Sequence, residues 1–176
     1  LATKYLIQKY KDYKFPCTIL RLYLVYGPRQ DYNRLIPIVI RGCIKNKKFP
    51  TSNGNQSRSF LFVDDFIRAV IKCLNNDVAK GQIFNVGSNN LNLKIKDIAK
   101  TISKLNKNYK ILIDDKSEDK RNYFVNFDKI YSKLGFKAKY SIEKGAKELY
   151  KKIKEKKFKN LKKIIYNNYS IEVKNL

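Results

Sequence analysis

The segment Thr18–Tyr26 (TILRLYLVY) constrains the fold of this chain more than any other part of its sequence. It is a nearly continuous run of aliphatic, β-branched and aromatic side chains, with Arg21 as its one charged residue. Such a run is typical of a strand that is buried on both faces of a parallel sheet. Gly27-Pro28 ends it abruptly, as a turn does. We therefore expect a buried parallel strand over residues 18–26.

Helical and extended patterns alternate along the rest of the chain, which predicts an α/β domain. Asp64 or Asp65 is placed to cap one helix, Ser141 to cap another, and Gly135 to end a third. Residues 45–54 and 114–121 have the polar composition of loops. The expected helices cover residues 1–13, 35–44, 66–74, 95–105, 127–134 and 142–153, and the expected strands cover residues 60–63, 82–86 and 109–113.

Composition narrows the possible chemistry. The chain has 176 residues, 43% of them apolar, which suits one domain with its own core. It contains no histidine, so imidazole catalysis and histidine metal ligation are excluded for this chain. Cys17, Cys43 and Cys73 are widely spaced among apolar neighbours, which is typical of reduced, buried cysteines in a cytoplasmic protein. No apolar run is long enough to span a membrane.

Four blocks in this sequence resemble, in the same order, those of extended short-chain dehydrogenases that act on nucleotide sugars. Residues 20–30 (LRLYLVYGPRQ) are similar to the family segment LRxxNVYGPRQ, and residues 55–65 (NQSRSFLFVDD) to GxQxRDFxxVDD. Residues 81–88 (GQIFNVGS) resemble the turn GxxxNVGS, and residues 121–136 (RNYFVNFDKIYSKLGF) resemble RxYxxDxxKxxxxLGF. The resemblance covers residues 1 to about 155.

This resemblance implies a fold and an origin. We expect an α/β fold that forms the carboxy-terminal part of an extended Rossmann-like nucleotide-sugar epimerase or dehydratase: the last sheet strands plus the substrate-binding α/β subdomain. Residues 1–158 would form this half and residues 159–176 a basic tail. The intact parent would be a cytoplasmic, homodimeric NAD- or NADP-dependent enzyme that oxidises a sugar ring and then epimerises, dehydrates or reduces it. Its catalytic Tyr-x-x-x-Lys pair would precede Leu1, so we expect no catalytic residue here and no activity of this chain alone.

The substrate-binding residues are expected in three loops. Arg58 matches the family arginine that pairs with the diphosphate, while Lys116 and Asp119 match positions near the phosphate and ribose, and Arg121 is a further candidate clamp. Guanidinium groups suit phosphates because their forked donors bind two oxygens at once. Arg58 could instead be a solvated loop arginine, and Arg121 could simply brace the loop. Lys116 also stands where relatives have arginine, and so lacks that fork.

Three further groups of residues complete the predicted site. The helix after Gly27-Pro28 opens with Asn33, Arg34 and Leu35, whose backbone N–H groups could meet an anion. The segment Phe49-Pro50-Thr51 resembles one that relatives lay along the nucleotide base, although Phe49 could equally anchor a loop. A nicotinamide is expected at the carboxyl end of the first strand, which carries Tyr23, Leu24 and Val25. Leu24 replaces a family asparagine that contacts substrate, which leaves the sugar open. Tyr26 and Tyr123 are interpreted as packing aromatics.

The formal charge of +24 supports a different hypothesis. Ten lysines fall between residues 144 and 163, interleaved with Tyr150 and Phe158. Such a surface could bind RNA or another acidic partner through its phosphates, with strong salt dependence. Lysine is spread over every segment, however, which favours biased composition over a dedicated nucleic-acid surface.

Overall fold

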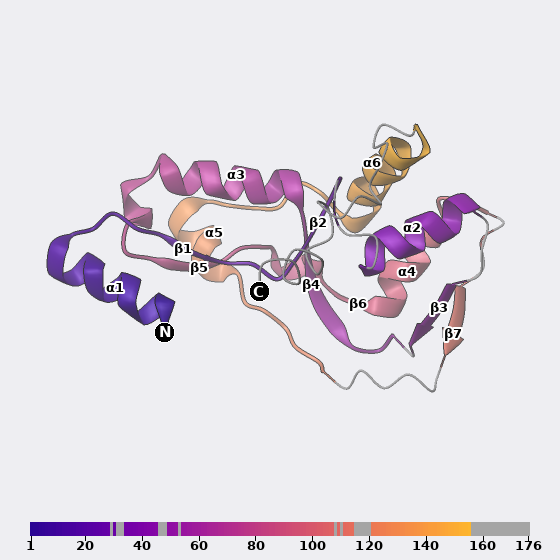
Figure 1. Ribbon diagram of the computed structural model, residues 1–176, viewed down its shortest axis with the longest axis horizontal. Helices are drawn as coiled ribbons and strands as arrows, with labels where there is room; N and C mark the ends of the chain where they lie inside the picture. Colours follow the sequence, from indigo (N-terminus) through magenta and orange to yellow (C-terminus); the bar gives the residue numbers. More distant parts are fainter. Residues whose placement is uncertain are drawn as a thin grey trace, which may run out of the picture.

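The computed structural model describes residues 1–28, 30, 34–45, 49–52, 54–107, 109, 111–114 and 121–155. The molecule is elongated, with helix α1 (Ala2–Tyr13) at one end and helix α2 (Leu35–Lys45) at the other (Figure 1). Helices and mostly parallel strands alternate along the chain, so the predicted α/β class is confirmed.

The apolar run of residues 18–26 forms two short strands instead of the single predicted one. Strand β1 (Ile19–Arg21) pairs in parallel with β5 (Ile83–Asn85), and β2 (Leu24–Tyr26) pairs in parallel with β4 (Ser57–Phe62). The break at Leu22 and Tyr23 lets the chain change partners between two sheets. The expectation of parallel pairing is confirmed, whereas that of one continuous strand is wrong.

Two strands were not expected from the sequence. Strand β3 (Phe49–Ser52) lies within a predicted loop and pairs in parallel with β7 (Ile111–Asp114). Strand β6 (Asn92–Lys94) pairs antiparallel with β4 and completes a sheet of order β2-β4-β6. Short strands of this kind are specified by their partners, because three or four residues carry little periodicity of their own.

The remaining helices lie close to their predicted positions. Gly135 ends its helix in a left-handed conformation with φ 58°, and the Ser141 hydroxyl accepts a hydrogen bond from the Lys144 N–H at 3.2 Å, as expected. Phe62 stands at the N-cap position of α3, and neither Asp64 nor Asp65 caps that helix. The helices are α3 (Val63–Leu74), α4 (Ile95–Ser103), α5 (Asp128–Leu134) and α6 (Ile142–Lys154), with short 3-10 helices η1 (Asp77–Ala79) and η2 (Asn89–Leu91).

Strand β4 separates two hydrophobic cores, because alternate side chains of a strand point to opposite faces. Phe60 and Phe62 belong to the first core, with residues of α2, α4 and α6, while Leu61 belongs to the second core, with residues of α3, β5 and α5. The first core contains Tyr26, Ile36, Val39, Ile40, Cys43, Phe60, Phe62, Ile95, Ile98, Ile102, Tyr109, Ile142, Ala146 and Leu149. The second core contains Leu61, Ala69, Cys73, Ala79, Phe84, Val86, Leu91, Val125, Phe127, Ile130, Leu134 and Phe136.

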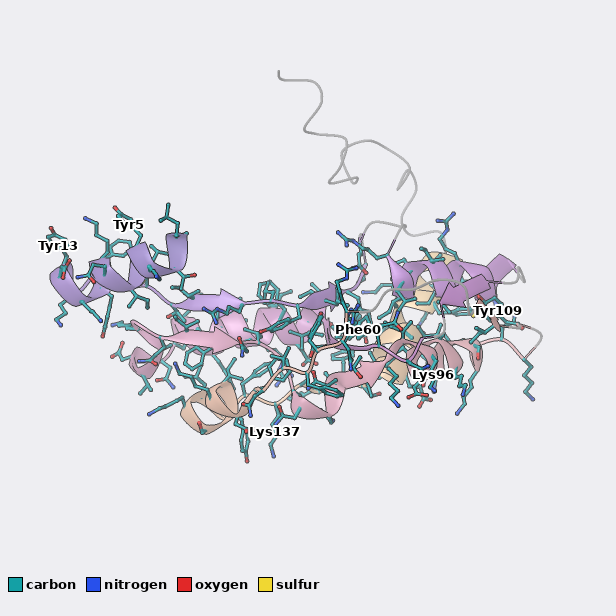
Figure 2. The ribbon with its side chains drawn as sticks, turned by 90° about the horizontal axis from the view of Figure 1, so that it is seen from below. Tyr5, Tyr13, Phe60, Lys96, Tyr109 and Lys137 are labelled. Atoms are coloured by element: carbon teal, nitrogen blue, oxygen red, sulfur yellow. The ribbon has the colours of Figure 1, made fainter. Side chains whose placement is uncertain are left out.

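Helix α1 differs from the others in that none of its residues is buried. Tyr5 and Tyr13 project from it at 60% and 70% exposure, at the end of the molecule furthest from Tyr109 (Figure 2). Over the part of the chain that is described, no helix combines the length and the apolar character needed to cross a membrane.

Candidate functional site

Arg58 lies within β4 and not just before a strand, opposite Leu93 of β6. Its side chain is held inside the protein, with only 8% of the residue exposed. The Nη1 atom donates to the Ser57 carbonyl at 2.8 Å and to the Arg121 carbonyl. The guanidinium carbon also lies 5.1 Å from the centre of the Tyr123 ring, within the range of a cation–π interaction. Arg58 is therefore an oriented cation and not a solvated loop side chain.

The irregular segment 121–127 is attached to β4, η2 and β6 by asparagine side chains. Asn122 accepts a hydrogen bond from the Ser57 N–H at 2.9 Å. Asn92 binds both backbone groups of Val125, accepting from its N–H at 3.0 Å and donating to its carbonyl at 2.9 Å. An amide can do this because it carries a donor and an acceptor side by side. Backbone groups that no strand satisfies are thus paired, and the segment beside Arg58 is fixed.

The predicted phosphate-binding residues are brought together in part. Arg58 and Arg121 meet, since the guanidinium of one binds the carbonyl of the other. Arg121 is exposed and follows directly on the segment that carries Lys116 and Asp119. Lys116, Asp119 and Asn33 lie outside the described residues.

Arg34 and Leu35 are found at the start of α2, as predicted. Leu35 is the first residue of the helix, and the Arg34 carbonyl accepts the N–H of Ile38 at 3.0 Å. Their role as an anion site stays a prediction.

Phe49, Pro50 and Thr51 lie on β3, where they pair with residues of β7. The paired backbone makes this segment more regular than the loop that the sequence predicted. Its contact with a nucleotide base stays a prediction.

The three predicted nicotinamide-binding residues make different contacts. The Tyr23 hydroxyl donates to Asn85 Oδ1 at 3.0 Å, and its ring packs edge-on against Phe127 with centroids 6.0 Å apart. Leu24 packs against the first core, and the Val25 carbonyl accepts from the Gln30 side chain at 2.8 Å. The apolar side chains at this strand end would fit the face of a nicotinamide ring. They offer no group that would hold a pyrophosphate.

Helix α3, which follows β4, is also unsuited to binding a phosphate. The first turn of α3 carries the acidic residues Asp64 and Asp65. Carboxylates occupy the positive end of the helix dipole, where a phosphate would otherwise be favoured. At this edge of the sheet the described residues therefore suit the nicotinamide end of a dinucleotide and not its phosphates.

Asp65 is fully buried and connects α3 to a distant segment. Its carboxylate accepts the N–H groups of Lys139 at 3.0 Å and Tyr140 at 2.9 Å, and also binds the guanidinium of Arg68. Asp64 is exposed and, within the described part of the chain, accepts one hydrogen bond, from the Tyr140 hydroxyl at 3.3 Å. The two residues that were predicted as alternative helix caps thus have different roles, and Asp65 is structural.

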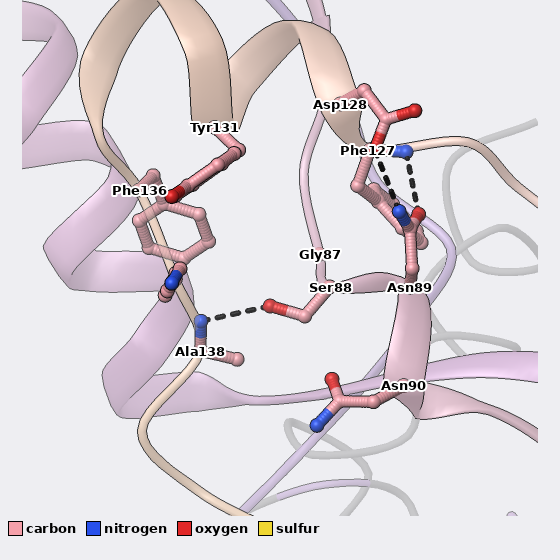
Figure 3. A pocket seen from close by; sticks show the side chains of 10 residues that line it. Gly87, Ser88, Asn89, Asn90, Phe127, Asp128, Tyr131, Phe136 and Ala138 are labelled. Carbon is pink, nitrogen blue, oxygen red and sulfur yellow. Dashed lines mark hydrogen bonds between the residues drawn. The ribbon is translucent and has the colours of Figure 1, made fainter.

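A cavity of about 460 Å³ opens at the carboxyl end of β5, where Ser88 Oγ accepts the Ala138 N–H at 2.8 Å (Figure 3). Gly87 is required there, because an added Cβ would lie 2.5 Å from the Phe127 ring. Asn126 and Asn89 donate to Asp128, which lowers the pKa of that carboxyl group. The resemblance at residues 81–88 indicated this turn but gave no indication of the cavity beside it. The cavity is lined by Gly87, Ser88, Asn89, Asn90, Phe127, Asp128, Tyr131, Phe136, Lys137 and Ala138.

The spacing Tyr-x-x-x-Lys also occurs within this chain. Tyr5 and Lys9 show it on α1, with Lys9 Nζ 5.5 Å from the centre of the Tyr5 ring. Tyr5 lies at the opposite end of the molecule from Tyr109 and well away from Phe60 of β4 (Figure 2). The geometry therefore gives no reason to place a reaction at this pair.

The basic carboxy-terminal region is described only as far as residue 155. On α6, Lys147 pairs with Glu143 at 2.6 Å, and Lys144 Nζ lies 4.3 Å from the centre of the Tyr140 ring. Glu148 further interrupts the positive surface of this helix. Some of these lysine side chains thus interact with other residues of the same chain. In the residues that the structure describes, no cluster of carboxylates and thiols could hold a metal ion.

Comparison with known proteins identifies a family for the first half of the chain. Residues 1–87 match the model of the NAD dependent epimerase/dehydratase family. A dTDP-D-glucose 4,6-dehydratase from Bos taurus is 30% identical over 158 residues, which cover 84% of this chain and 44% of that protein. A dTDP-glucose 4,6-dehydratase from Shigella flexneri is 28% identical over the same length, with the same coverage. The chain thus spans about half the length of these relatives.

Solved structures give the same result. The dTDP-glucose 4,6-dehydratase of Bacillus anthracis, in complex with NAD, is 25% identical and superposes with a TM-score of 0.72 over 89% of this chain and 50% of that one. A mutant UDP-glucuronic acid 4-epimerase of Bacillus cereus, in complex with UDP-4-deoxy-4-fluoro-glucuronic acid and NAD, is 26% identical with a TM-score of 0.66, over 83% of this chain and 48% of that one. The described fold is therefore that of the corresponding half of these Rossmann-like enzymes.

Proposed function

This chain belongs to the NAD dependent epimerase/dehydratase family, and on that premise we propose that it forms the nucleotide-sugar-binding part of such an enzyme. The observation that carries the proposal is the oriented guanidinium of Arg58, which two carbonyls and one aromatic face hold in β4. A nucleoside diphosphate sugar presents a diphosphate with about two negative charges, and arginine is the side chain best suited to bind it.

The remaining predicted residues would contact other parts of the nucleotide sugar. The backbone of Arg121 lies against Arg58 through its carbonyl, so its side chain would supply a second cation near the diphosphate, and Lys116 and Asp119 belong to the segment just before it. The segment Phe49-Pro50-Thr51 would lie along the base, and the helix start at Asn33, Arg34 and Leu35 would meet an anionic group.

The chemistry of the intact enzyme would depend on a nicotinamide cofactor. Leu24 and Val25 would form part of the surface against which the nicotinamide ring rests, and Tyr23 would support them from the second core. NAD or NADP would supply the acceptor for a hydride taken from the sugar ring. Inversion, loss of water or reduction would then follow, with the general base provided by residues outside this chain. We further propose that the intact enzyme is a homodimer. Cys43 and Cys73 are buried, as predicted, whereas Cys17 is only partly buried.

A nuclear magnetic resonance titration tests the proposal directly. Addition of dTDP or UDP to the folded, isotope-labelled chain is expected to shift the backbone amide signals of Arg58, Thr51 and Arg121. The amide of Lys4 on α1 serves as a control, because it lies at the far end of the molecule from this site. Thymidine and uridine, which lack the diphosphate, should produce smaller shifts. A folded sample that shows no response to either diphosphate would overturn the proposal.

A further inference from the structure

The cavity at the carboxyl end of β5 is lined by two opposite charges that do not neutralise each other. Asp128 and Lys137 both line it, yet neither forms an ion pair, with the other or with any residue in the described ranges. A ligand with an anionic group at one end and hydrogen-bond donors at the other would satisfy both charges at once.

The Asp128 carboxylate is held in a fixed orientation. Asn89 Nδ2 donates to Oδ1 and Asn126 Nδ2 donates to Oδ2, each at 2.7 Å. Asn89 is fixed in turn, because its Oδ1 accepts the Phe127 N–H at 3.0 Å. An ionised carboxylate only accepts hydrogen bonds, and its two oxygens keep free lone pairs after these two bonds. Asp128 therefore suits a ligand with donor groups, such as the neighbouring hydroxyls of a sugar ring.

Other lining side chains offer donors. Ser88 Oγ accepts the Ala138 N–H at 2.8 Å, which leaves the hydroxyl hydrogen available to donate. The Asn90 side chain has no hydrogen bond to a described residue, and Figure 3 shows it at the other end of the group of lining side chains from Asp128. Lys137 adds a positive charge. A hydroxyl, an amide and an ammonium group together suit the oxygens of a phosphate group.

The cavity also contains an exposed aromatic ring. Tyr131 is 50% exposed, and Lys137 Nζ lies 4.6 Å from the centre of its ring. A phosphate held by Lys137 would thus bring the body of the ligand beside this ring. The volume of about 460 Å³ falls within the range of small-molecule sites, roughly 300–1,000 Å³. The space is therefore sufficient for one sugar ring and its phosphate.

We propose that this cavity binds a monosaccharide phosphate, with the phosphate held by Ser88, Asn90 and Lys137 and the sugar hydroxyls by Asp128. Simpler ligands use only part of it. Inorganic phosphate would leave Asp128 without a partner, and a neutral sugar would leave Lys137 without one. The inference does not depend on the proposed function, because none of the lining residues is among those assigned to the nucleotide sugar.

A nuclear magnetic resonance titration of the whole chain with glucose 6-phosphate, inorganic phosphate and glucose tests this proposal. About 0.15 M salt screens general attraction to the basic surface. Glucose 6-phosphate should shift the amide signals of Ser88, Asn90 and Lys137. It should bind about tenfold more tightly than either inorganic phosphate or glucose, because only it engages both charges. Equal affinities for glucose 6-phosphate and inorganic phosphate, or shifts centred on Arg58, would overturn the proposal.

Variants at the two charges assign the two ends of the ligand. Lys137→Ala should weaken the binding of glucose 6-phosphate by about fivefold and also weaken that of inorganic phosphate, whereas Asp128→Asn should weaken only glucose 6-phosphate. Lys133→Ala is the matched control, because it removes the same charge from α5 outside the cavity lining. Lys137→Gln, which keeps most of the side-chain length, replaces Lys137→Ala if that variant does not fold. Equal weakening by Lys137→Ala and Lys133→Ala would contradict the proposal, as would tighter binding of glutamate than of glucose 6-phosphate.

Discussion

The two cores on either side of β4 are stabilised in different ways. The first core is closed by apolar contacts between three helices and the faces of Phe60 and Phe62. The second core has a smaller set of side chains and is surrounded by loops whose backbone groups bind Asp65, Asn85, Asn89 and Asn92. Helices satisfy their own backbone, so a core between helices needs few polar partners. A core that is closed by irregular segments needs many.

The polar atoms of the two cores show the same difference. In the first core the hydroxyls of Tyr26 and Tyr109 are buried without a hydrogen-bond partner among the described residues. Beside the second core, Asp65 binds three donor groups and Asn92 binds Val125 through both of its amide atoms. We therefore expect the second core to be sensitive to loss of polar groups, and the first core to changes in volume and to alkaline pH.

The largest effect is expected from Asp65→Ala. This change leaves two backbone N–H groups without their acceptor in a buried site and removes the ion-pair partner of Arg68. The free energy of unfolding should fall by about 3–5 kcal/mol, measured by urea denaturation. Asp64→Ala is the matched control on the same helix turn and should change the stability much less. Equal effects of the two substitutions would remove the basis for the contrast between the cores.

The first core should respond most strongly to added volume. A Cβ at Gly145 would lie 2.2 Å from the Tyr26 hydroxyl oxygen and 3.0 Å from Phe62. Gly145→Ala should therefore lower the free energy of unfolding by about 1–3 kcal/mol. Tyr26→Phe alone should be neutral or stabilising, because it removes an unpaired buried hydroxyl. The double variant should recover part of the loss, and failure to recover any would show that the hydroxyl is not the obstacle.

Alkaline pH tests the first core without any substitution. Burial raises the pKa of Cys43 from its ordinary 9.0 to about 11, and that of Tyr109 from 10.0 to about 12. The unfolded chain releases these protons first, so their contribution to stability is complete below about pH 9 and is lost between about pH 9 and 12. Cys43 alone should account for a loss on the order of 1 kcal/mol by pH 10. Cys43→Ala should reduce the slope of stability against pH over this range, and an unaltered slope would contradict the prediction.

The smallest effect is expected on α1, which belongs to neither core. Leu6→Ala should lower the free energy of unfolding by less than about 1 kcal/mol, because no residue of α1 is buried. Ile98→Ala on α4, where the side chain is 1% exposed, should cost about 2–5 kcal/mol in the same urea assay. Comparable losses would mean that α1 is packed more tightly in solution than its exposure indicates.

Elements with long periodic patterns could be predicted from the sequence. The helices over α2, α4, α5 and α6 follow from apolar spacing, and Gly135 and Ser141 have the local chemistry of helix ends. The division of residues 18–26 into two strands could not be predicted, because it depends on which strands lie alongside. For the same reason β6 was missed: its three residues become a strand only by pairing with Ser57, Arg58 and Ser59.

The resemblance named Arg58 and Arg121, and the structure joins the Arg58 guanidinium to the Arg121 backbone carbonyl; that they bind a diphosphate stays a prediction. The sequence gives no sign that Asn92 and Asn122 would fix the neighbouring backbone, since their partners lie 33 and 65 residues away along the chain. Likewise Tyr123 was interpreted as a packing aromatic, and its contact with Arg58 became visible only in three dimensions.

Calorimetric titration of the whole chain with dTDP and with thymidine tests most directly whether this is a diphosphate-binding site built on Arg58. Charge-assisted hydrogen bonds to the diphosphate should make dTDP bind about 10–100-fold more tightly than thymidine. Arg58→Ala should abolish most of that difference, while Lys133→Ala, an equal loss of charge on the exposed surface of α5, should preserve it. Equal affinities for dTDP and thymidine, or an unchanged ratio in Arg58→Ala, would contradict the account.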